Sequence, residues 1–222
     1  MKFLILLRNW KDTLLRLLKR THSRNSSDTS TTSKPANLVG ICVGHSRPDD
    51  MGALSVTGVN EWMFNVRVAF HVQRYLEKRG IKSIIYDEYH GIGYTASIKW
   101  LAQTLKADGV TLAIELHFNA ASASAQGCEM LYYHRSASGK RLATSLQREV
   151  LREYDTKDRG IKPLKRFSRG GAFLVNTKCV AVLCEPFFGT NPRDWEKFST
   201  TRTVLAEAYA RGIKTFLSEV SA

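Results

Sequence analysis

Short apolar runs alternate with longer amphipathic segments from residue 38 to the end of the chain. Apolar runs of roughly four to eight residues between turn residues are typical of buried strands, and apolar residues spaced three and four apart predict helices. The expected strands are 38–43, 81–86, 111–116, 128–133, 172–175 and 180–184. The expected helices are 61–79, 95–107, 139–154, 191–198 and 200–218, with a basic loop at 156–169.

This alternation predicts an α/β fold: a mostly parallel or mixed twisted sheet of about six strands, with helices on both faces, in a single domain. The length of 222 residues is enough for one domain with a substantial core. In such sheets, ligands bind beyond the carboxyl ends of the strands. Candidate functional residues should therefore lie at strand ends.

The N-terminal 37 residues have a different pattern. Residues 1–20 carry an apolar stripe at helical spacing, with basic residues mostly off it. The stripe consists of Phe3, Leu7, Trp10, Leu14, Leu17 and Leu18. It predicts a basic amphipathic helix on an anionic membrane surface, or a helix that packs on its own domain or on another copy. Residues 21–37 are Ser/Thr-rich with few apolar side chains, which predicts a flexible linker before a folded domain at 38–222.

The apolar run at residues 3–7 is too short for the core of a signal peptide and for a membrane span. We therefore expect synthesis in the cytoplasm, followed by release with outside help or by attachment to a membrane surface.

The net charge is +13, of which residues 1–37 contribute +6 and the rest +7. Such a charge favours polyanionic partners: nucleic acid, anionic lipid or an acidic cell-wall polymer. No helix-turn-helix, zinc-finger or RNP pattern is present and the basic residues are scattered, so nucleic acid is not an expected partner.

Four cysteines are present: Cys42, Cys128, Cys179 and Cys184. Three lie in or beside apolar runs, and no CxxC spacing occurs. Free cysteine in such a setting behaves as a small buried hydrophobe, so we expect reduced structural thiols and no cysteine-based zinc site.

His45, Glu61, His117 and Glu185 each lie where an expected strand or loop ends and a helix follows. Two imidazoles and a carboxylate suit Zn²⁺ and leave a fourth position for water. Glu185 ends an apolar strand and could move the proton of that water. Taken singly, each has an ordinary explanation, such as a helix N-terminal glutamate for Glu61. Their joint placement predicts a zinc hydrolase.

Four motifs contain these residues in order. They are Val43-Gly44-His45, Gly58-Val59-Asn60-Glu61, Glu115-Leu116-His117-Phe118-Asn119-Ala120 and Val182-Leu183-Cys184-Glu185-Pro186-Phe187-Phe188. In these motifs, and in stretches 127–133, 159–162 and 190–194, the chain resembles the zinc-dependent N-acetylmuramoyl-L-alanine amidases of the type-3 group. The resemblance covers about residues 38–222.

The resemblance implies that His45, Glu61 and His117 hold one Zn²⁺ with a water. Glu185 would act as general base toward that water and then protonate the departing amine. The substrate would be the amide between N-acetylmuramic acid and L-alanine in peptidoglycan, cut during cell-wall lysis or remodelling at the cell wall or periplasm. A monomeric phage or prophage endolysin is the favoured context, and a host remodelling enzyme is second.

Two positions depart from the family pattern. Ser46 stands where a glycine usually follows the first histidine, and Glu115 stands where a serine is common. Period-two alternation puts Glu115 on the side of His117, where it could accept a hydrogen bond from an imidazole or perturb the site. Glu115 and Asn119 are the candidates for supporting the metal ligands.

Two other functions remain open. A zinc-dependent peptidoglycan peptidase or carboxypeptidase would use the same ligand types, although no HExxH pair occurs. A non-catalytic peptidoglycan-binding module could keep the fold. Glu129 lies in a strand near the site, and its side chain could face solvent or contact the site. The basic loop at 156–169 could be solvated or could touch the carboxylates of the stem peptide.

Overall fold

The computed structural model describes residues 37–221, which lie in one compact unit spanning Ala36–Ala222. The amphipathic helix expected at 1–20 and all but the last residue of the linker expected at 21–37 lie outside the described residues. None of the helices within the described range is long and apolar enough to cross a membrane.

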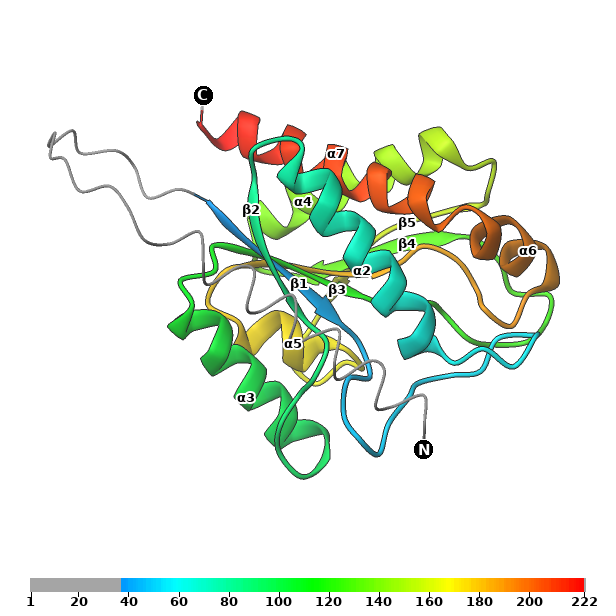
Figure 1. Cartoon of the computed structure of the whole chain (residues 1–222), viewed down its shortest axis with the longest axis horizontal. Coiled ribbons are helices and arrows are strands. Elements are labelled where there is room, and N and C mark those ends of the chain that lie inside the picture. Colours follow the sequence, from blue (N-terminus) through cyan, green and yellow to red (C-terminus); the bar gives the residue numbers. More distant parts are fainter. Residues whose placement is uncertain (1–36, 222) are drawn as a thin grey trace, which may run out of the picture. The chain divides into compact units, whose positions relative to one another are not determined.

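A six-stranded mixed sheet forms the centre of the domain, in the order β2-β1-β3-β6-β4-β5 (Figure 1). The strands are β1 (Leu38–Val43), β2 (Lys82–Tyr86), β3 (Leu112–Leu116), β4 (Cys128–Tyr133), β5 (Asp158–Leu164) and β6 (Val180–Glu185). The strands β2, β1, β3 and β6 run parallel, while β4 is antiparallel to β6 and parallel to β5. The amino ends of β4 and β5 therefore lie at the same end of the sheet as the carboxyl ends of β1, β2, β3 and β6.

One face of the sheet is covered by α2 (Glu61–Glu77), α4 (Ala137–Glu153) and α7 (Arg202–Ser221), with α6 (Pro192–Thr200) at the end of this layer (Figure 1). Apolar side chains of these helices pack against alternate residues of the central strands in one large core. Ile41, Ile114 and Val182 are fully buried in it. Alternation along each strand selects the residues of this face.

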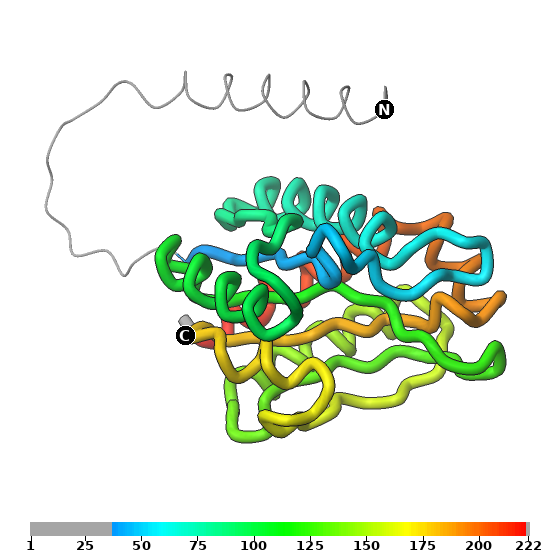
Figure 2. Tube along the Cα trace, turned by 90° about the horizontal axis from the view of Figure 1, so that it is seen from below, coloured from blue at the N-terminus to red at the C-terminus, as the bar shows by residue number. Residues whose placement is uncertain are grey.

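The other face carries α3 (Gly93–Ala107) and the short α5 (Gly171–Asn176) (Figure 2). Their apolar residues form a smaller core with the opposite set of strand residues, including Ala113, Ala181 and Leu183. This layer leaves the carboxyl end of the sheet uncovered on the α3 side, where a cavity opens.

The predicted fold class is confirmed, with helix and strand bounds shifted by a few residues, but two predicted elements were wrong. Residues 172–175 are not a strand; they belong to α5, whose Phe173 and Leu174 are buried on the sheet. A short apolar run cannot be assigned to strand or helix by periodicity alone. The strand that the prediction missed is β5, which lies inside the predicted basic loop at 156–169. As an edge strand it tolerates charged residues and Pro163.

All four cysteines are free, and three of them are buried, as predicted.

Candidate active site

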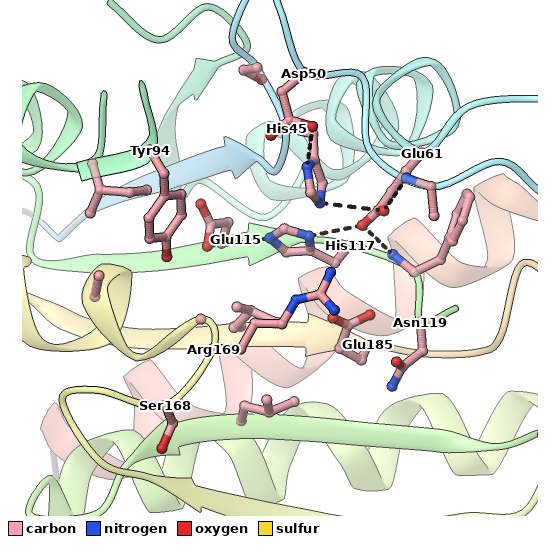
Figure 3. Close-up of a pocket in the computed structure, with 18 of the residues that line it drawn as sticks. His45, Asp50, Glu61, Tyr94, Glu115, His117, Asn119, Ser168, Arg169 and Glu185 are labelled. Carbon is pink, nitrogen blue, oxygen red and sulfur yellow. Dashed lines mark hydrogen bonds and ion pairs between the residues drawn. The ribbon is translucent and has the colours of Figure 1, made fainter. Parts of the chain in front are cut away.

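A cavity of about 670 Å³ opens at the edge of the sheet where β1, β3 and β6 end (Figure 3). The four predicted residues, His45, Glu61, His117 and Glu185, all line it. They come from the loop after β1, the first residue of α2, the residue after β3 and the last residue of β6. The fold therefore brings together residues that are up to 140 positions apart in the sequence.

His45 has a left-handed backbone, with φ of 58°, and is the one non-glycine residue with positive φ among residues 37–221. Such conformations are uncommon outside glycine and cluster at functional sites. The Nδ1 atom of His45 lies 2.9 Å from Oδ1 of Asp50, and its Nε2 lies 3.4 Å from Oε2 of Glu61. Donation from Nδ1–H to Asp50 would leave the Nε2 lone pair facing Glu61.

Glu61 begins α2, whose N-cap is Asn60. Its carboxylate accepts hydrogen bonds from two backbone amides: Ala53 to Oε2 at 3.1 Å and Phe118 to Oε1 at 3.1 Å. The side chain is almost completely buried. These bonds and the positive end of the helix dipole hold the carboxylate toward the histidines.

His117 lies between two carboxylates. Its Nδ1 is 2.8 Å from Oε1 of Glu61, and its Nε2 is 3.3 Å from Oε2 of Glu115, although the second contact lacks the angle of a hydrogen bond. A Cβ atom on Gly44 would come within 2.2 Å of the His117 ring, so only glycine lets the turn after β1 approach this closely. The hydroxyl of Tyr89 donates to the other oxygen of Glu115 at 3.3 Å.

The carboxylates of this cluster favour positive charge on their neighbours, as the pKa shifts of Glu61 and His117 indicate. Burial alone would raise the pKa of Glu61, but the hydrogen bond from His117 and the charges of both imidazoles bring it below its ordinary value. Burial would lower the pKa of His117, but contacts with Glu115 and Glu61 raise it well above its ordinary value. A divalent cation would satisfy the same demand as a proton does.

The cluster also has the donor set of a metal site. One ligand atom from each of His45, Glu61 and His117 lies within 4.8 Å of the others. Two imidazole nitrogens and one carboxylate oxygen suit Zn²⁺ with a fourth position open. Asp50 lies behind one imidazole and Glu115 behind the other, and carboxylates commonly support metal-binding histidines in this way. The residues therefore fit a zinc ion.

Glu185 lies beside this cluster, at the end of β6. Its side chain is half-buried, and its Oε2 atom is shielded from solvent and has no hydrogen-bond partner among the described residues. Burial, with smaller contributions from the negative charges of Glu61 and Glu129, raises its pKa to about 8, against the opposing effects of His117 and Arg169. A carboxyl group with a pKa near neutrality can both accept and donate a proton.

Comparison with known proteins agrees with this geometry. The family model described as N-acetylmuramoyl-L-alanine amidase matches residues 39–215. The chain belongs to this family. Among solved structures, the catalytic domain of the CD27L endolysin targeting Clostridia difficile is 29% identical to this amidase, covers 81% of it over 97% of its own chain, and superposes with a TM-score of 0.69.

Two further relatives extend the comparison. The CwlD amidase of Clostridioides difficile, solved with the GerS lipoprotein, shares the fold at 20% identity, with 82% of this chain and 99% of that chain covered and a TM-score of 0.73. The protein YqiI of Bacillus subtilis (strain 168) is 24% identical over 183 residues, which are 81% of this amidase and 84% of YqiI.

The structure gives each departure from the family pattern a local role. Ser46 is buried and its hydroxyl donates to the carbonyl of Val43 at 2.6 Å, which closes the turn after β1. Glu115 is buried against His117 and Tyr89. Glu115 thus places a carboxylate next to the second histidine, His117.

Asn119 was predicted to support the metal ligands, but its side chain hydrogen-bonds to Glu129. Its side-chain amide donates to Oε1 of Glu129 at 2.6 Å, and Oε2 of Glu129 accepts from Nε of Arg159 at 3.0 Å. Glu129 is directly opposite Glu185 in the β4–β6 pairing and lines the cavity. The guanidinium of Arg159 also lies 4.9 Å from the ring centre of Phe188.

From the sequence, Glu129 could face solvent or the site, and Arg159 belonged to a basic loop that could be solvated or touch the carboxylates of the stem peptide. Alternation with buried Cys128 and Met130 could have put Glu129 on the other face of β4, but no local signal pairs that strand with β6. Asp50 was missed because nothing in the local sequence shows that the loop folds back to His45.

Aromatic packing supports the segments that carry His117 and Glu185. Phe118 and Phe187, which follow them in the chain, have ring centres 5.6 Å apart, and Phe187 stacks on Phe198 of α6 at 4.5 Å. The buried carboxylate of Asp194 accepts from the backbone amides of Gly127 and Phe188, both at 3.0 Å. Helix α6 thereby ties the two sides of the site together.

Proposed function

We propose that this amidase hydrolyses the amide bond between N-acetylmuramic acid and L-alanine in peptidoglycan, with one zinc ion held by His45, Glu61 and His117. Family membership supports the reaction. The observation that carries the metal assignment is the convergence of three ligand atoms within 4.8 Å. Asp50 at Nδ1 of His45 and the charge of Glu115 near Nε2 of His117 would leave Nε2 of His45 and Nδ1 of His117 as the ligand atoms.

A zinc ion bound here supplies Lewis acidity at the scissile carbonyl and lowers the pKa of water. Glu61 contributes a negative charge that its two backbone donors keep in place. Glu115 places a negative charge 3.3 Å from Nε2 of His117, where it favours a proton on that nitrogen.

Glu185 is proposed to take the proton of the attacking water and pass it to the leaving amine. An amide has a poor leaving group, so its cleavage needs an acid as well as a base. Burial and the raised pKa of Glu185 support both roles, because the group holds a proton at neutral pH in the absence of a neighbouring cation and releases it when one binds.

The N-terminal segment adds a separate proposal. Residues 1–20 would form a helix that attaches to anionic membranes, and 21–37 would link it to the catalytic domain at 38–222. In this proposal the protein is a monomeric endolysin or wall-remodelling enzyme that acts at the cell wall. A protein lacking residues 1–37 should lyse permeabilised cells as well as full length does and intact cells less well; an unchanged ratio of the two activities would refute the membrane role.

Digestion of purified peptidoglycan tests the reaction and the site together. The full chain is incubated with a chelator, with added zinc, and as the Glu185→Ala variant, and the products are identified by mass. We expect zinc-dependent release of intact stem peptides with a free L-alanine amine, lost in the variant. Release of single amino acids would instead identify a peptidase, and zinc binding without any release would identify a binding module.

A further inference from the structure

The cavity has a second wall that the proposed chemistry does not use. This loop wall, residues 165–170 between β5 and α5, contributes Arg166, Phe167 and Arg169 to the lining. Tyr94, near the start of α3, lines the same cavity. In Figure 3, Arg169 extends into the cavity toward the side occupied by His117 and Glu185.

Two backbone hydrogen bonds form turns within the loop wall. The amide of Ser168 donates to the carbonyl of Lys165 at 3.1 Å, and the amide of Gly171 donates to that of Ser168 at 2.8 Å. A Cβ atom on Gly171 would lie 2.2 Å from the Lys165 carbonyl oxygen, and one on Gly170 would lie 2.9 Å from Leu183 of β6. The end of the loop therefore packs closely against β6, next to Arg169.

Two arginines near the site are paired with carboxylates, whereas Arg166 and Arg169 of the loop wall have no such partner among the described residues. Arg47 pairs with Asp50 at 2.7 Å, and Arg159 pairs with Glu129 at 3.0 Å. Arg169 has no ion pair or hydrogen bond within residues 37–221, although its charge is close enough to act on Glu185 and Tyr94. A cation directed into a cavity without a carboxylate partner is available for an anionic ligand.

An unpaired cation in this cavity would offset the negative charge that a carboxylate-bearing substrate meets there. Five carboxylates line the cavity, at Asp50, Glu61, Glu115, Glu129 and Glu185. A stem peptide with free carboxylates would be repelled by these groups unless a positive charge received it. Arginine is suited to this task because its planar guanidinium can hold a carboxylate with two parallel hydrogen bonds.

We propose that the loop wall is the stem-peptide subsite and that Arg169 binds a free carboxylate of the residues that follow L-alanine. This assignment rests on the proposed function, and the substrate feature that it adds is a free carboxylate in the stem peptide. Phe167 is 97% exposed and Tyr94 46% exposed at this cavity, so both offer apolar surface to the bound peptide.

Two pairs of muropeptides test the assignment. The first pair consists of N-acetylmuramoyl tripeptides in which the γ-carboxyl of residue two is joined to residue three. The α-carboxyl of residue two is free in one (D-isoglutamate) and amidated in the other (D-isoglutamine), so only the second lacks a free carboxylate at residue two. The second pair consists of tripeptides whose third residue, a diamino acid, has its side-chain carboxylate free or amidated. The zinc-supplemented full chain is assayed for kcat and KM, and binding to the Glu185→Gln variant is measured by calorimetry.

The wild type should prefer the free carboxylate of at least one pair by about tenfold, mainly through KM. Arg169→Gln should abolish this preference and Arg169→Lys should restore part of it. Lys165→Gln removes one positive charge from the same loop, but Lys165 is exposed and does not line the cavity, so this variant should keep the preference.

Three outcomes would overturn the assignment. They are equal treatment of acid and amide in both pairs by wild type, an unchanged preference in Arg169→Gln, and a fall in kcat shared by all substrates with the preference intact. The last would mean that Arg169 acts through Glu185. Failure of the proposed function is a different result: the wild type would cleave no muropeptide of either pair.

Discussion

The two walls of the cavity are built on opposite principles. The ligand wall is formed by His45, Glu61 and His117, with Asp50 and Glu115 behind them. Its polar groups contact one another and are buried or half-buried. The loop wall carries exposed side chains, and Arg169 has no partner in the described part of the chain. The polar groups of the ligand wall have partners within the protein, whereas Arg169 of the loop wall is available to an anionic ligand.

This difference follows from the cost of burying charge. A charge removed from water must be matched by a partner and by hydrogen bonds, so the ligand wall could form only with its backbone donors and second carboxylates in place. An exposed arginine stays hydrated and needs no such support. Substitutions in the ligand wall should therefore affect metal binding and stability, and those in the loop wall should affect substrate choice.

Removal of the metal should have the largest effect. Chelation should lower amidase activity by at least about 10³-fold, and added zinc should restore it. His117→Ala should lose activity to the same extent without rescue by zinc, because the ligand itself is absent. Full activity of a protein shown by elemental analysis to contain no metal would contradict the zinc assignment.

Substitution of Glu185 should separate proton transfer from metal binding. Glu185→Gln keeps the size of the side chain but cannot accept the proton, so kcat should fall by about 10²- to 10⁴-fold while the zinc content stays at the wild-type level. Glu196→Gln, at an exposed position of α6, is the matched control and should change neither quantity. A parallel loss of zinc and activity in Glu185→Gln would show that Glu185 supports the metal instead.

The same variant should change stability with a defined pH dependence. The pKa of Glu185 is raised from 4.5 to about 8, chiefly by burial, so the native state binds the extra proton in this window and stability falls as pH rises from 4.5 to 8. Glu185→Gln should therefore stabilise the chelated protein by about 2–4 kcal/mol above pH 8 and by nearly nothing below pH 4. Urea unfolding at both pH values measures the difference; an equal effect at both would mean that the charge is not its cause.

Loss of the carboxylates behind the histidines should weaken zinc binding without removing a ligand. Glu115→Gln and Asp50→Asn should each lower zinc affinity by roughly 10- to 100-fold, as measured by competition with a chelating indicator. Asp49→Asn is the matched control, because Asp49 neighbours Asp50 but its side chain is 70% exposed. If all three variants bound zinc equally, Asp50 and Glu115 would have no supporting role.

The smallest effect on stability is expected at Phe167 in the loop wall. Because its ring is 97% exposed, Phe167→Ala should change the free energy of unfolding by less than about 0.5 kcal/mol. Phe187→Ala, in the fully buried aromatic cluster behind the ligand wall, should cost about 3–5 kcal/mol. Similar costs at the two positions would remove the distinction between the walls.

Much of the fold and of the candidate site could be predicted from the sequence. Apolar periodicity and turn residues are local, so they located β1, β3 and β6 to within about a residue at most ends, and the motifs at those strand ends identified the four residues that line the cavity. The two wrong elements, at 158–164 and 172–175, share one cause. An edge strand and a six-residue helix carry too little pattern to be distinguished from a loop and a strand.

The sequence by itself determined the α/β class, the order of the elements and the residue types at the strand ends. Only the tertiary structure decided that Asp50 folds back to His45, that Glu129 lies opposite Glu185, and that Arg169 enters the cavity from a loop beyond the edge strand. These contacts join segments through strand pairing and loop closure. Both depend on which elements pack together, and no local pattern of apolar and polar residues encodes that choice.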